Sequence, residues 1–139
     1  MDPKLNFVLS RCTGVVDDQS LLIHLMSFGI ESRAFPIIRE LVDLRYLKSD
    51  DRLTVRGLMK IADTHRELIP KKDFLSAVLV NTPSTKKMIE VYSLLVSTET
   101  LRVKIFTGDV DRALIWLGYD DWEVENLKGF VTRHTGVND

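Results

Sequence analysis

The sequence predicts an α/β fold, because short β-forming runs alternate with segments whose apolar residues recur at helical spacing. Turn and capping residues separate these segments along the whole chain. A chain of 139 residues and 15.9 kDa corresponds to one domain, which buries roughly 68% of its unfolded surface. We therefore expect a single-layer sheet, mixed or parallel, of four strands with four or five helices, whose crossovers are right-handed.

The first strand is predicted over residues 5–16, which are rich in β-forming residues and bend near Gly14. Asp17 or Asp18 is placed to cap the helix that follows, and Gly29 is placed to end it. The apolar stripe of this helix consists of Leu21, Leu22, Leu25, Met26 and Phe28.

The central strand is predicted over residues 39–47, which are apolar enough to be buried on both faces of a sheet. Strict alternation places Asp43 and Arg45 on one face, together with Leu41 and Leu47. The carboxylate and the guanidinium could anchor a ligand near the end of the strand, but we favour a structural role, either as a pair or with each group in contact with neighbouring turn amides.

In the middle of the chain, strands and helices continue to alternate. Residues 49–52 predict a polar turn, Thr54 is placed to cap the second helix, and residues 75–80 predict the third strand. Residues 81–87 then start a third helix, where free backbone N–H groups and two lysines favour an anion. Capping by Ser84 or Thr85 explains the same residues, and we favour that interpretation.

The last part of the chain begins with residues 101–106, whose clean alternation predicts a half-exposed strand near a sheet edge. A helix over residues 110–117 follows, and Gly118 closes it. We assign residues 1–118 to one domain and residues 119–139 to a C-terminal helical appendage.

Composition excludes several classes of function. A net charge of −1 and a pI near 6.3 give no electrostatic reason to expect a nucleic acid or an anionic membrane as partner. No apolar run approaches the ~18 residues of a membrane span, so we expect no membrane insertion and a cytoplasmic protein. The single Cys12 is interpreted as a small buried hydrophobe in preference to a catalytic thiol.

Known catalytic motifs are missing from the sequence. It has no glycine-rich phosphate loop, no His-Glu-x-x-His and no paired cysteines, and His24, His65 and His134 are widely separated. We therefore expect no enzyme activity, no catalytic residues, no cofactor and no metal site.

Several strings spread over residues 2–118 resemble one family. They are FVLSRCTGVV at 7–16, ELVDLR at 40–45, AVLV at 77–80, and VKIF at 103–106 leading into DRALIWLG at 111–118. These strings resemble the small bacterial STAS-like proteins usually called SpoIIAA-like. The resemblance implies a sheet of four or five strands with helices packed mainly on one side, and a role in protein interaction or regulation.

Two departures from the family pattern affect what the resemblance implies. Members commonly have an extra strand before the first one predicted here, and an open edge in its place would be covered by a second copy of the chain. Regulated relatives carry an Asp-Ser-Ser-Gly-Leu string, whose end matches Gly57-Leu58, but here residues 54–56 are Thr-Val-Arg, so no serine occupies the position that is phosphorylated in those relatives. Thr54 and Ser49 are the substitute candidates for phosphorylation.

The first expected function is a non-enzymatic interaction module, a homodimer that meets an unknown protein partner through the turns at residues 47–54 and 81–87. The alternative is a carrier of a small apolar or lipid-like ligand held between helices and sheet. The candidate interaction or anion-binding residues are Asp43, Arg45, Ser49, Thr54, Asn81, Ser84, Thr85 and Lys86.

Overall fold

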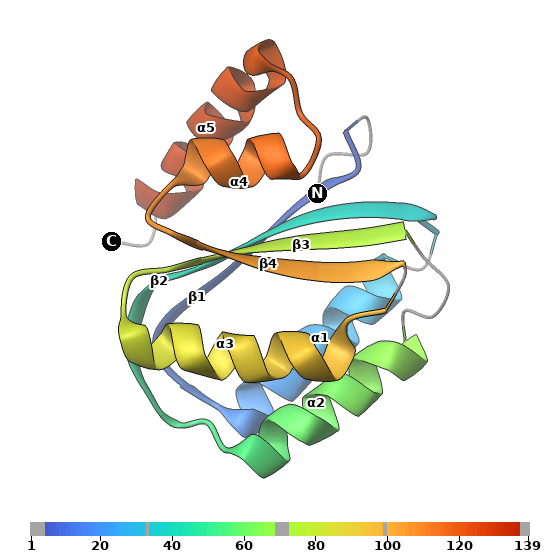
Figure 1. Cartoon of the computed structure of the whole chain (residues 1–139), viewed down its shortest axis with the longest axis vertical. Helices are drawn as coiled ribbons and strands as arrows, with labels where there is room; N and C mark the ends of the chain where they lie inside the picture. Colours follow the sequence, from blue (N-terminus) through green and yellow to red (C-terminus); the bar gives the residue numbers. More distant parts are fainter. Residues whose placement is uncertain (1–4, 33, 69–72, 99, 137–139) are drawn as a thin grey trace.

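The computed structural model describes residues 5–32, 34–68, 73–98 and 100–136 (Figure 1). Strands and helices alternate along the chain as far as the two last helices. The elements are β1 (Phe7–Asp17), α1 (Asp18–Glu31), β2 (Ile37–Arg52), α2 (Val55–Leu68), β3 (Asp73–Val80), α3 (Pro83–Val96), β4 (Leu101–Thr107), α4 (Val110–Trp116) and α5 (Asp121–Gly136).

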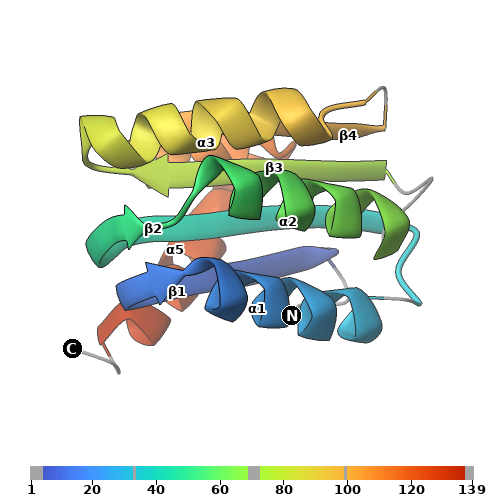
Figure 2. The same cartoon turned by 90° about the horizontal axis from the view of Figure 1, so that it is seen from below.

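The described strands form one parallel sheet in the order β1-β2-β3-β4, so neighbours in sequence are neighbours in the sheet. Helices α1, α2 and α3 cover one face, and α4 and α5 lie against the other (Figures 1 and 2). The predicted α/β fold with a four-stranded sheet and a C-terminal helix is confirmed.

Strand β2 is longer than its sequence predicted. The polar turn expected at residues 49–52 is wrong, because β2 continues to Arg52 and pairs there with Asp17 of β1. The register between the two strands shifts after Arg11, where an extra residue enters β2. Such an irregularity breaks strict alternation, and Leu47 consequently packs with Leu44 instead of lying on the opposite face.

The two faces of the sheet carry separate hydrophobic clusters. On the α4 and α5 face, Leu41 and Leu79 pack with Leu114 and Leu127, and both helices share this cluster. On the other face, Ile38 and Phe74 belong to a second cluster with residues of α1, α2 and α3. The sheet is therefore buried on both sides, as a parallel sheet requires.

The helix ends confirm some predicted caps and correct others. Asp17 caps α1 in a capping box, and Gly118 adopts a left-handed φ of 101° after α4. The prediction that Gly29 ends α1 is wrong, since the helix continues to Glu31 and ends at Ser32. Capping of α3 by Ser84 or Thr85 is also wrong, because Thr82 is the N-cap and Pro83 occupies the first helical position.

Candidate ligand-binding site

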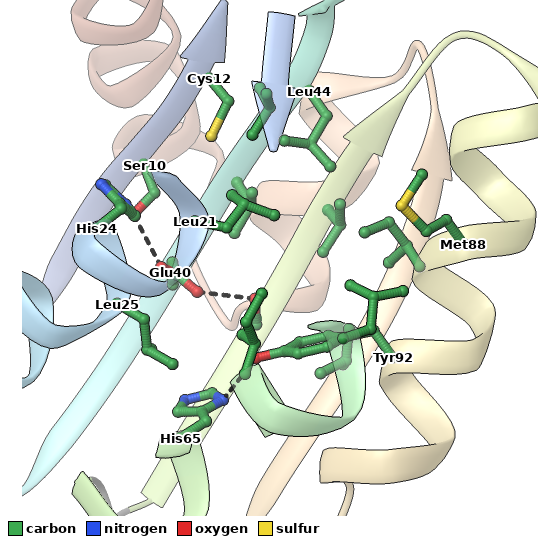
Figure 3. A pocket seen from close by; sticks show the side chains of 18 of the residues that line it. Ser10, Cys12, Leu21, His24, Leu25, Glu40, Leu44, His65, Met88 and Tyr92 are labelled. Carbon is green, nitrogen blue, oxygen red and sulfur yellow. Dashed lines mark hydrogen bonds between the residues drawn. The ribbon is translucent and has the colours of Figure 1, made fainter. Parts of the chain in front are cut away.

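A partly open cavity of about 130 Å³ lies between the sheet and the layer formed by α1, α2 and α3 (Figure 3). Its walls are mostly aliphatic and aromatic side chains from both layers. The polar side chains that interrupt this apolar lining include Ser10, His24, Glu40, His65, Ser76 and Tyr92. An apolar cavity with a few converging polar groups is the usual form of a small-molecule site.

Glu40 lies in β2, on the sheet side of the cavity, and both of its carboxylate oxygens accept a hydrogen bond. The Ser10 hydroxyl of β1 donates to Oε2 at 2.8 Å, and the Ser76 hydroxyl of β3 donates to Oε1 at 2.9 Å. The parallel register places Ser76 directly opposite Glu40 and pairs Ser10 with Val42, two residues further along β2. Three neighbouring strands therefore hold this carboxyl group in one orientation.

Among the described residues, no cationic side chain forms an ion pair with the carboxyl group of Glu40. Burial raises its pKa, while the hydrogen bonds from Ser10 and Ser76 and the charge of His24 oppose that rise. A carboxylate in apolar surroundings is costly unless it is paired, so Glu40 is a polar centre held by hydroxyl groups without a charged partner among the described residues.

His65 and Tyr92 form the second polar feature of the cavity (Figure 3). His65 Nδ1 and the Tyr92 hydroxyl are 3.0 Å apart, and the two rings stack. In the part of the chain that the structure describes, His65 Nε2 is buried and has no hydrogen-bond partner. Burial lowers the pKa of His65 to about 4, and burial with the nearby Glu40 raises that of Tyr92, so both groups are neutral at pH 7.

Cys12 also lines the cavity, in agreement with its predicted place in the first strand. Burial raises the pKa of its thiol to about 11, and the charges of Glu40 and Asp43 add to the effect. The thiol is protonated at neutral pH, whereas a nucleophilic cysteine requires a lowered pKa.

Asp43 and Arg45 form the structural pair that the sequence favoured. Arg45 Nε and Nη2 donate to the two Asp43 carboxylate oxygens, each at 2.9 Å, and the Arg45 backbone N–H donates to Oδ1 at 3.1 Å. Asn81 Nδ2 donates to the Arg45 carbonyl at 2.9 Å, which brings a third predicted residue to the same place. The sequence placed Asp43 near the end of its strand, but it lies in the middle of the longer β2. It is the last residue of β2 that pairs with β3.

The other predicted residues do not gather around this pair. Thr54 immediately precedes α2, and its hydroxyl donates to Asp18 at 2.7 Å and accepts from the Gly57 N–H at 2.9 Å. Ser49 lies in β2, and its side chain is outside the described part of the structure.

The predicted residues at the start of α3 have different environments. Thr85 is buried, and its backbone N–H donates to the Thr82 hydroxyl, whereas Ser84 and Lys86 are exposed on α3. The described contacts thus divide the candidate interaction residues among three places: the Asp43 pair with Asn81, the start of α2 and the start of α3.

No family model, curated protein or solved structure matches this chain. Among the described residues, no group of three or more His, Cys, Asp or Glu side chains is placed to hold a metal ion. In the same part of the chain, no helix is both long enough and apolar enough to cross a membrane.

Glu40 and its serine partners were not among the residues that the sequence singled out. The available signal was strand alternation, which places Glu40 on the same face of β2 as Val42 and Leu44. A charged residue at a strand position otherwise buried is a candidate site residue, and this signal is independent of any motif.

Proposed function

We propose that this protein binds a small, mostly apolar molecule in the cavity between the sheet and helices α1, α2 and α3. The observation that carries the proposal is the Glu40 carboxyl group, which is held by two serines inside an otherwise apolar cavity. A half-buried carboxyl group in an apolar cavity without a cationic partner costs stability, and such costs are typical of positions kept for binding.

The cavity volume limits the size of the ligand. A cavity of about 150 Å³ in another protein accommodates benzene, so the 130 Å³ here suits a molecule about as large as one small ring. A long-chain lipid exceeds this volume unless most of its chain lies outside. Of the small apolar and lipid-like ligands that the sequence suggested, the short ones fit best.

Native mass spectrometry of the purified protein is the first experiment. We expect the wild-type protein to retain a small molecule, and Val42→Phe, which fills the cavity from β2, to lose it. Val91→Phe is the matched control, since Val91 is exposed on α3 and does not line the cavity. Only protein masses for the wild type, or equal retention by Val42→Phe, would count against the proposal.

An interaction module that forms a homodimer is a second candidate, and the outer surface of α1 favours it. Ile23, Met26 and Ile30 are 56%, 49% and 64% exposed and follow one another at helical spacing. Contiguous apolar residues on a surface favour contact with another protein. Light scattering at micromolar concentration tests this candidate, and a mass near 15.9 kDa would exclude the dimer under those conditions.

A further inference from the structure

The charges around the cavity discriminate between classes of small apolar ligand. Glu40 is the acidic residue in the lining, and none of the described lining residues is a lysine or an arginine. Each Glu40 oxygen accepts one serine hydroxyl, and a carboxylate oxygen has lone pairs for a further donor. The group is therefore oriented by the protein and still able to accept from a ligand.

The electrostatic effect of Glu40 extends to other groups in the cavity. Its charge disfavours ionisation of both Cys12 and Tyr92, and Asp43 adds to the effect at Cys12. An anionic ligand such as a fatty acid would bring a second negative charge into this region. Like charges in apolar surroundings repel strongly, so the cavity disfavours carboxylate ligands.

The histidines of the cavity do not provide a bound countercharge. His65 is buried, and its Nδ1 already shares a hydrogen bond with Tyr92. His24, on α1, acts on Glu40 from a distance, but no hydrogen bond or ion pair joins the two within the described residues (Figure 3). The position beside the Glu40 oxygens therefore suits a cation supplied by the ligand.

We propose that the ligand is a small apolar amine, whose ammonium group pairs with Glu40 and whose ring or short chain occupies the aliphatic part of the cavity. This inference rests on the proposed binding function and names the chemistry of the ligand. An ammonium group donates charge-assisted hydrogen bonds to the carboxylate and neutralises it, while the apolar body replaces water along the walls.

Three probes with the same ring test this inference: benzylamine, benzyl alcohol and benzoate. Each is titrated into wild-type protein, Glu40→Gln and Glu90→Gln, and affinities are obtained from amide chemical-shift changes in NMR spectra. Glu90 is exposed on α3 outside the cavity lining, so its substitution changes the net charge equally without altering the cavity.

In the wild type we expect benzylamine to bind about tenfold or more tightly than benzyl alcohol, and benzoate to bind most weakly. Glu40→Gln should abolish the preference for the amine, and Glu90→Gln should retain it. Equal or tighter binding of the alcohol by the wild type, or an unchanged preference in Glu40→Gln, overturns the amine assignment and leaves the binding function standing. If no probe shifts the cavity resonances at millimolar concentration, both proposals fail. The wild-type ranking decides the question even if a variant does not fold.

Discussion

Replacing Glu40 with glutamine is expected to stabilise the ligand-free protein, and to do so more at high pH than at low pH. Burial raises the pKa of Glu40 above its ordinary value of 4.5, so the folded protein holds this proton after the unfolded chain has lost it. The contribution of Glu40 to stability is therefore fully present below 4.5 and is lost as pH rises through the folded-state pKa. Glutamine does not titrate and does not suffer this loss.

The magnitude follows from the environment of the carboxyl group. Each pH unit between the folded and unfolded pKa values corresponds to about 1.4 kcal/mol. Glutamine keeps one acceptor for Ser76 or Ser10 and offers its amide N–H to the other hydroxyl, so the hydrogen-bond losses are small. We expect the stability advantage of Glu40→Gln to be larger at about pH 8 than at about pH 5, by up to about 1.4 kcal/mol for each pH unit that separates the folded from the unfolded pKa of Glu40.

Urea denaturation followed by circular dichroism measures this advantage at both pH values. Subtracting the wild type cancels the groups that titrate in both proteins, and Glu90→Gln controls for the change in net charge. An advantage of Glu40→Gln that stays constant or shrinks as pH rises would refute the account of a carboxyl group without a charged partner.

Three further predictions concern stability. Arg45→Met removes both guanidinium hydrogen bonds to the buried Asp43 carboxylate and is expected to lower the free energy of unfolding by about 3–5 kcal/mol in urea denaturation. A loss below about 1 kcal/mol would contradict this. A glycine-to-alanine change stabilises most helices by about 1 kcal/mol, but Gly57→Ala should destabilise this protein, because the new Cβ would lie 2.0 Å from Asp18 Cγ. In protein that also carries Asp18→Ala, this penalty should disappear. An equal effect of Gly57→Ala with and without Asp18→Ala would exclude the clash. Burial lowers the pKa of His65 from 6.5 to about 4, so the unfolded chain takes up this proton first as pH falls. The fold should therefore lose about 3 kcal/mol of stability between pH 6.5 and about pH 4. A midpoint near 6.5 in an NMR titration of the His65 ring would disprove this.

Much of the fold follows from local patterns. The apolar run of residues 75–80 became β3, buried along most of its length, and the alternation of residues 101–106 became the edge strand β4. The length of β2 could not be read in the same way, because residues 49–52 are polar and join the strand only through pairing with β1. Pairing between segments far apart in sequence overrides the local preference of polar residues for turns.

The candidate site was less accessible to sequence analysis. Alternation brought Asp43 and Arg45 onto one face, and their contact is observed. The significance of Glu40 depends on Ser10 and Ser76 from neighbouring strands and on Tyr92 from α3. These side chains come from different elements and meet in one cavity because of the order of the strands in the sheet. The spacing of residues within β2 does not indicate this arrangement.

The most direct measurement of the binding function is a methyl NMR titration of the wild-type protein with benzyl alcohol, a neutral probe that binds whether or not the amine assignment is correct. The cavity methyl groups of Leu25, Val42 and Val78 report occupancy, and the exposed methyl groups of Leu94 serve as the internal control. We predict saturable shifts confined to the cavity methyl groups. Shifts that do not saturate, or that are centred on the exposed side chains of α1, would contradict a ligand site between the sheet and its three helices.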